Sequence, residues 1–206
     1  MNKLDNKTRA QIIRCLVEGS SIRGTARMVG VQHKTVLRLL EDIGEVCREY
    51  QDKHLRNLTC KRLQLDEIWS FCHAKARNVP ADKRDVFGYG DVWTWTAIDA
   101  DSKLCVSWLI GKRDAECAIE IVQDVSERVV IRLQITTDNL RSYLIAIEEV
   151  FGSDVDYAIL QKIYARAIAE TATTRYSPPQ CIGIKTDMVL GNPDPEKFQT
   201  AAARAS

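Results

Sequence analysis

Two aspartates occupy the positions in this sequence where carboxylates could act together. Asp66 follows the alternating run 62–65, and Asp138 ends the run RLQITTD at residues 132–138. Both runs have the period of a strand, so each acid is expected near a strand end. Two carboxylates on adjacent strands could bind Mg²⁺ or Mn²⁺, and a two-metal site can clamp both reacting oxygens of a phosphodiester. The alternative is that both are ordinary solvated acids.

Other reactive side chains lack a recognisable pattern. The seven cysteines are scattered, only three histidines accompany them, and the spacing of a zinc site or a glycine-rich phosphate loop is absent. An odd number of cysteines without a CxxC or an export signal predicts reduced thiols in a cytoplasmic protein. No apolar run approaches ~18 residues, so no membrane partner is expected.

The elements around the two aspartates predict an α/β fold with a mixed sheet. The runs 92–98 and 104–110 alternate on either side of a polar turn, which is typical of a hairpin. A helix is expected after the N-cap Asp114, then the strand that ends at Asp138, then a helix over 140–151. The predicted order is therefore three strands, a helix, a fourth strand and a second helix.

A basic segment precedes this acidic one. Residues 1–62 hold 13 Lys/Arg and 7 Asp/Glu, a net charge of +6, and residues 63–206 hold 16 and 21, a net charge of −5. The two net charges nearly cancel, so the whole chain has a net charge of only +1. A basic end is typical of proteins that bind phosphates, although small helical segments are also often basic.

The basic segment predicts three helices with a helix-turn-helix. Asn6 or Thr8 is expected to cap the first and Gly19 to end it, and Ser20 or Ser21 caps the second, which stops at Gly30. The third starts near residue 32, and its packed face is expected to hold Val36, Leu39, Leu40 and Ile43. The outward start of this helix supplies residue types that reach bases and phosphates: Gln32, His33, Lys34, Thr35 and Arg38. A three-helix bundle without a DNA role is the alternative.

Four blocks of sequence carry a resemblance to a known family. They are LDEIWSF at 65–71, GYGDVWTWTAIDADSKLCVSWLIGKRD at 88–114, TTDNLRSYL at 136–144, and RYSPPQCIG with GNPDP between 175 and 195. In order and interval they resemble the transposases of the insertion element one type. The resemblance implies a helix-turn-helix DNA-binding domain, residues 1–58, followed by a ribonuclease-H-like domain of the DDE class, residues 59–206.

The resemblance also implies an activity and its residues. Metal-dependent cleavage and strand transfer would act on the inverted-repeat ends of an element. The expected partners are double-stranded DNA, from the element ends and the target, and further copies of the chain in a homo-oligomer. Asp66 and Asp138 would be the first two acids, and both would hold Mg²⁺ or Mn²⁺. The family's third acid, a glutamate, lies in a YVERxN-like stretch beyond GNPDP.

This third acid has no counterpart by sequence. Glu148 and Glu149 lie on the helix after Asp138, while Glu170 and Glu196 lie near loops. We therefore expect a C-terminally truncated transposase whose ribonuclease-H-like domain is incomplete and which is inactive alone. The alternatives are a non-enzymatic helix-turn-helix regulator and an inhibitor of full-length transposase.

Overall fold

The computed structural model describes residues 4–84, 86, 88–164 and 181–198. The chain forms two compact units, Met1–Leu55 and Arg56–Ser206, whereas the sequence places the domain boundary after residue 58. None of the helices in the described residues is long and apolar enough to cross a membrane.

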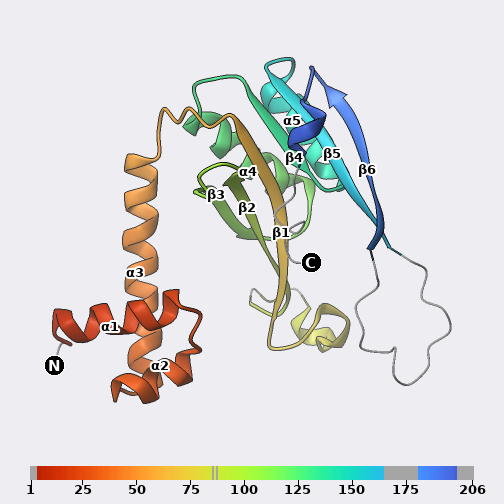
Figure 1. Cartoon of the computed structure of the whole chain (residues 1–206). Coiled ribbons are helices and arrows are strands. Elements are labelled where there is room, and N and C mark those ends of the chain that lie inside the picture. The colour runs from red at the N-terminus through yellow and green to blue at the C-terminus, as the bar shows by residue number, and fades with distance from the viewer. Residues whose placement is uncertain (1–3, 85, 87, 165–180, 199–206) are drawn as a thin grey trace. The chain divides into compact units, whose positions relative to one another are not determined.

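The first unit is a group of three helices, drawn in red and orange in Figure 1. They are α1 (Asn6–Val17), α2 (Ile22–Val29) and α3 (His33–His54). Their small core consists of Ile12, Ala26, Val36 and Leu39. Ala26 leaves room for the close crossing of α2, and the buried pair on α3 has the three-residue spacing expected from the sequence.

Both ends of α2 are set by the residues that flank the helix. The Ser21 hydroxyl accepts a hydrogen bond from the Gly24 amide at 3.1 Å, as a helix N-cap does. Gly30 ends α2 with φ of 75°, a left-handed conformation that favours glycine. Both ends were predicted by the residue types and are confirmed.

Two other expectations for this unit, the N-cap of α1 and the burial of Leu40, were wrong. The N-cap of α1 is Asp5, whose carboxylate accepts a hydrogen bond from the Thr8 amide at 2.7 Å, rather than Asn6 or Thr8 itself. The expected end of α1 at Gly19 is confirmed, because Gly19 directly follows the C-cap Glu18 with φ of 79°. Leu40 is 43% exposed because Leu39, its neighbour on α3, takes the core position.

The second unit is built on one mixed sheet with two α-helices. Within the described residues the strands are β1 (Arg62–Cys72), β2 (Gly90–Asp99), β3 (Cys105–Gly111), β4 (Leu133–Thr137), β5 (Val155–Tyr164) and β6 (Cys181–Leu190). Their order across the sheet is β3-β2-β1-β4-β5-β6. The pairs β1–β4 and β4–β5 are parallel, and the other three pairs are antiparallel.

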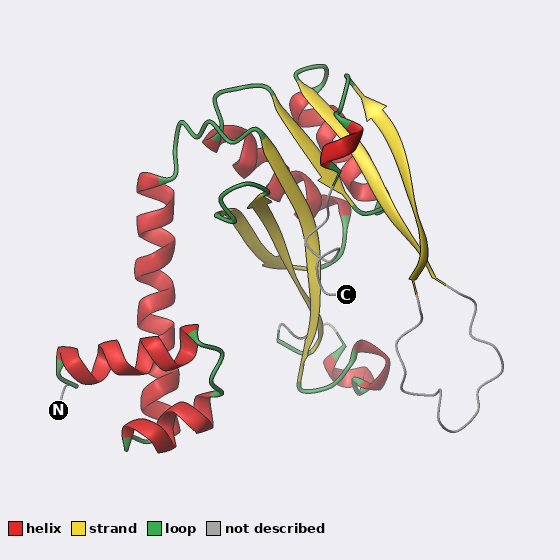
Figure 2. Ribbon diagram, viewed as in Figure 1, coloured by secondary structure: helices red, strands yellow, loops and turns green. Residues whose placement is uncertain are grey.

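Two helices supply the long crossovers that parallel strands need. Helix α4 (Ala115–Arg128) joins β3 to β4, and α5 (Arg141–Phe151) joins β4 to β5. Figure 2 shows both helices on the same side of the sheet. Their apolar faces and the inward residues of five strands form the main core, with Trp95 and Tyr143 edge to face at 5.4 Å. Short 3₁₀ turns lie at Ala76–Asn78, Ala81–Lys83 and Pro195–Lys197.

The sequence predicted the first part of this unit and missed the last strands. The hairpin of β2 and β3, the N-cap Asp114, the strand β4 and the helix α5 are confirmed. Strands β5 and β6 were not predicted. The expected helix end at Glu170, the first residues of the RYSPPQCIG block and the tail 199–206 lie outside the described residues.

Burial in helix α5 gives a matched test of this core. Ile147 is fully buried and Ile145, two residues earlier, is 53% exposed. We expect Ile147→Ala to lower the free energy of unfolding by about 2–5 kcal/mol, whereas Ile145→Ala changes it by about 0.5 kcal/mol or less. Urea unfolding followed by circular dichroism measures both. Equal effects of the two substitutions would contradict the placement of α5 on the sheet.

Candidate functional site

The pairing of β1 with β4 brings the two predicted aspartates together. Residues that pair between the two strands are 72 positions apart in the sequence, as Arg62 and Gln134 are. Asp66 and Asp138 have the same separation. Neighbouring strands lie about 4.8 Å apart, so a continued register sets these side chains next to each other. Both line one pocket of about 370 Å³ together with Arg113 and Lys162.

The pocket lies on the sheet face opposite the helices. Side chains alternate along a strand, and Leu63 and Leu65 of β1 point into the helix-covered core. Asp66 therefore points to the other face, while Glu67 points back toward α5. Leu160 and Lys162, at alternate positions of β5, line the pocket beside the acids.

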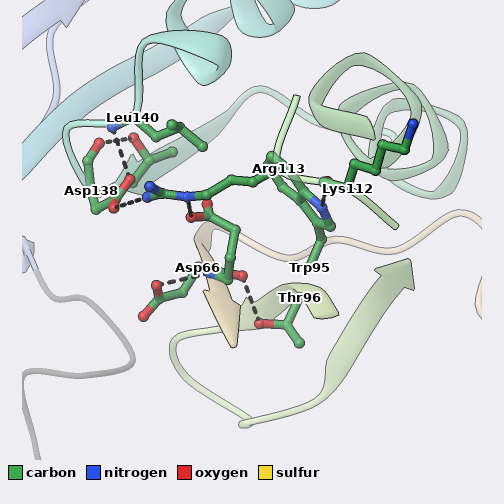
Figure 3. A network of polar contacts seen from close by, with 9 residues as sticks. Asp66, Trp95, Thr96, Lys112, Arg113, Asp138 and Leu140 are labelled. Atoms are coloured by element: carbon green, nitrogen blue, oxygen red, sulfur yellow. Dashed lines mark hydrogen bonds and ion pairs between the residues drawn. The ribbon is translucent and has the colours of Figure 1, made fainter. Parts of the chain in front are cut away.

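Asp138 has both carboxylate oxygens engaged. Its Oδ1 accepts a hydrogen bond from the Leu140 amide at 2.9 Å, which fixes the turn before α5. Its Oδ2 accepts from Arg113 Nη2 at 3.5 Å. Figure 3 shows these contacts at the carboxylate of Asp138, which lines the pocket.

The backbone of Asp66 is fixed by a hydrogen bond, and its carboxylate accepts fewer hydrogen bonds than that of Asp138. Its carbonyl oxygen accepts a hydrogen bond from the Thr96 hydroxyl at 3.2 Å, and its Oδ1 accepts from the next amide, Glu67, at 2.9 Å. Burial raises the pKa of the Asp66 carboxyl, and the charge of Asp138 raises it further. Lys162 and Arg113 act in the opposite direction but do not cancel the effect.

Arg113 links the pocket to the interior. It lies in the loop between β3 and α4, and its Nε donates to Glu67 Oε2 at 3.1 Å while Nη2 reaches Asp138. The guanidinium also stacks over Trp93, 4.8 Å from the ring centroid. Figure 3 shows Arg113 extending toward Asp138 while its neighbour Lys112 points away.

Glu67 is the buried end of this linkage. Its side chain is 1% exposed, and burial raises its pKa, which the Tyr143 hydroxyl and Arg113 only partly offset. Among the described residues, neither Glu67 Oε1 nor the Tyr143 hydroxyl has a well-formed hydrogen bond. The nearby Tyr143 hydroxyl and the ion pair with Arg113 together compensate part of the cost of burying this acid.

The acid pair suits a divalent ion that keeps several water ligands. Mg²⁺ is often bound by one or two carboxylates, with waters and phosphate oxygens completing its shell. Asp66 and Asp138 offer such a pair, facing a pocket that is open to solvent. In the part of the chain that the structure describes, no group of three or more His, Cys, Asp or Glu is placed to hold a metal.

A second candidate site lies in the first unit. Gln32, His33 and Lys34 of the predicted set line an open groove at the start of α3, and Arg23 and Arg27 of α2 line it with them. Gln32 makes no side-chain cap, and the first turn of α3 contains no acid. Exposed amides at a helix N-terminus favour anions, as do the surrounding cations.

The remaining predicted residues lie just beyond this groove. Arg38 is exposed and Thr35 is half-buried, and neither lines it. Arg23 and Arg27 were not predicted, because DNA contacts were expected only at the start of α3, although arginines four residues apart share a helix face. Arg113 and Glu67 were missed in the second unit because no pattern predicts an ion pair between residues 46 positions apart.

Comparisons with known proteins give little beyond this geometry. No family model and no curated protein matches the chain. Among solved structures, the chain is similar to the piggyBac transposase in a cryo-EM structure of its synaptic complex with hairpin DNA. The TM-score is 0.36 with 16% identity, and the match covers 85% of this chain and 34% of that one. The chain thus spans about a third of that transposase, and a likeness this distant supports no conclusion about function.

The raised pKa of Asp66 predicts a pH-dependent cost to stability. A folded-state pKa above the ordinary value of 3.8 means that the charged acid at neutral pH destabilises the fold. This cost is absent below 3.8 and is complete once the pH exceeds the raised pKa. We therefore expect Asp66→Asn to increase the free energy of unfolding at pH 7, with the gain disappearing as the pH falls toward 3.8.

Urea unfolding at the two pH values measures this, with Asp138→Asn as the control. That substitution gives up the ion pair with Arg113 while relieving the repulsion on Asp66, so a smaller gain is expected from it. An Asp66→Asn protein that is less stable than the parent at pH 7 would contradict the assigned environment.

Proposed function

We propose that this protein is a DNA transposase of the DDE class, of the insertion element one type. Helices α2 and α3 would form a helix-turn-helix that binds DNA. Asp66 and Asp138 would bind Mg²⁺ or Mn²⁺ in a ribonuclease-H-like domain that cleaves and joins DNA strands. The observation that carries the proposal is that Asp66 of β1 and Asp138, directly after the parallel strand β4, line one open pocket.

The acid pair provides what phosphodiester chemistry requires of the protein. Divalent ions bound there would supply the Lewis acid that activates a water or hydroxyl and stabilises the leaving oxygen. The chain's part is to position them: the Leu140 amide fixes Asp138, and strand pairing with Thr96 fixes Asp66. Lys162 sets a positive charge on the same pocket, where a DNA phosphate would lie.

The first unit supports the DNA-binding part of the proposal. Its groove gathers the cations Arg23, Arg27 and Lys34 at an uncapped helix N-terminus. A short helix, a glycine turn and a longer helix are the parts of a helix-turn-helix, whose second helix enters the major groove. The predicted contacts Gln32, His33, Thr35 and Arg38 would then face bases or phosphates.

A second function is favoured by a different observation. Arg113 already pairs with Asp138, so the acid pair is partly neutralised without any metal. A non-enzymatic DNA-binding regulator would use the second unit only as a folded module, and its acids would be structural. DNA binding without metal-dependent cleavage would support this second function.

A cleavage assay separates the two functions. The substrates are labelled duplexes that cover the DNA on either side of the coding sequence, incubated with the full chain and Mn²⁺. The proposed function predicts specific strand cleavage that falls at least about 10²-fold in Asp66→Ala and Asp138→Ala, because a misplaced metal misaligns the reacting groups. Such cleavage would refute the expectation, drawn from the missing third acid, that the chain is inactive alone. Glu149→Ala, an exposed acid on α5, serves as the matched control and keeps activity. Cleavage that survives both aspartate substitutions would overturn the site.

The salt dependence of DNA binding tests the first unit. Lys34→Ala is expected to weaken binding to all duplexes and to lower the slope of log K against log salt by about one, as the loss of a phosphate contact does. Lys53→Ala at the far end of α3 removes the same charge outside the groove and should leave the slope unchanged. Fluorescence anisotropy at several salt concentrations measures the slopes. Equal slopes for the parent and Lys34→Ala would contradict the assigned contact.

A further inference from the structure

Arg113 is shared between two carboxylates of different kinds. Glu67 is buried on the helix side of the sheet, with 1% of its side chain exposed, whereas Asp138 is 39% exposed and lines the pocket. A single guanidinium bridges them from the β3–α4 loop. One cation therefore connects the interior of the fold to the open acid pair.

The two contacts are unequal in strength. Arg113 Nε lies 3.1 Å from Glu67 Oε2, a normal hydrogen-bond length, whereas Nη2 lies 3.5 Å from Asp138 Oδ2, at the outer limit. The Glu67 contact is also the better shielded from water, which strengthens it. With the face of Trp93 beneath the guanidinium, Arg113 is anchored at Glu67 and only loosely held at Asp138.

A divalent ion at the acid pair would compete for the same oxygen. Asp138 Oδ1 accepts a hydrogen bond from the Leu140 amide and Oδ2 accepts one from Arg113 Nη2, so an ion that binds through Oδ2 meets the guanidinium. An incoming cation must displace Nη2 or bind beside a positive charge, and both lower its affinity. Asp66 and Asp138 without Arg113 would attract the ion more strongly.

We propose that Arg113 is a positioning residue that sets the affinity of the acid pair for divalent metal. It neutralises Asp138 in the metal-free protein and withdraws onto Glu67 when an ion binds. Glu67 acts through Arg113: its carboxylate keeps the guanidinium from closing fully on Asp138. This inference rests on the proposed function, because it concerns the same acid pair.

Metal binding to the full chain without DNA tests the proposal. Free Mn²⁺ is measured by electron paramagnetic resonance during titration of the protein. We expect Arg113→Gln to bind Mn²⁺ about three- to fivefold more tightly, the range of a partly exposed ion pair. The matched control is Lys112→Gln, the same change of charge one residue away on a side chain that points away from Asp138 (Figure 3). It should leave the affinity within about twofold of the parent.

A double-mutant cycle separates an effect through Arg113 from simple charge. Glu67→Gln is expected to weaken Mn²⁺ binding about three- to fivefold, because the released Arg113 moves onto Asp138. In the Arg113→Gln background the same Glu67 substitution should have no effect. Circular dichroism of each variant verifies the fold. Glu67 effects of equal size in both backgrounds would overturn the inference, as would equal tightening by Lys112→Gln and Arg113→Gln.

Mn²⁺ binding by the parent protein separates a failure of this inference from a failure of the proposed function. If the parent binds Mn²⁺ and loses it on Asp66→Asn, while Arg113→Gln changes nothing, the metal site stands and the role of Arg113 is refuted. If neither the parent nor Arg113→Gln binds Mn²⁺, both are refuted. Binding that appears only in Arg113→Gln would support the role of Arg113 most strongly.

Discussion

The parallel pairing of β1 with β4 is the constraint on which the candidate site depends. It joins segments 72 residues apart and sets Asp66 beside Asp138. A parallel pair cannot be closed by a tight turn, so the chain between these strands must make the hairpin of β2 and β3 and then cross over through α4. That crossover also places Arg113 in the loop before α4, next to the acids it joins.

The same pairing creates an electrostatic cost. Burial raises the pKa of Asp66, and the neighbouring Asp138 carboxylate raises it further, so the charged pair would destabilise the sheet if nothing opposed it. Arg113 offsets part of this electrostatic cost through its ion pairs with Asp138 and with the buried Glu67. A site that keeps uncompensated charge is less stable than an apolar one, which is the usual relation between stability and function.

Local elements of this fold were predictable from sequence, and long-range contacts were not. Ser21, Gly30 and Asp114 mark helix ends by their own chemistry, and the alternation of residues 92–98 marks a strand regardless of context. The two aspartates were recognised because each follows an alternating run. Asp138 lies at the end of β4 as predicted, whereas the prediction was wrong for Asp66, which lies in the middle of β1 because that strand continues to Cys72. Strands β5 and β6 lacked this signal because β5 is buried on both faces near its start and β6 is exposed on both.

The charged partners of the site depend on tertiary structure. Glu67 and Arg113 meet only after the sheet has formed, and nothing in either local sequence specifies the other. The same holds for Arg23 and Arg27, which join the start of α3 only through the turn at Gly30. Propensity and periodicity describe one segment at a time, so contacts of this kind need the structure.

Iron-directed cleavage of the protein tests the central claim most directly. Fe²⁺ can occupy oxygen sites that bind Mg²⁺ or Mn²⁺, and with ascorbate and peroxide it generates radicals that cut the polypeptide near the bound ion. The account predicts cuts in both β1 near Asp66 and β4 near Asp138, suppressed by excess Mg²⁺ and lost in Asp66→Asn. Cuts that avoid both strands, or that persist unchanged in Asp66→Asn, would contradict a metal site at this pair.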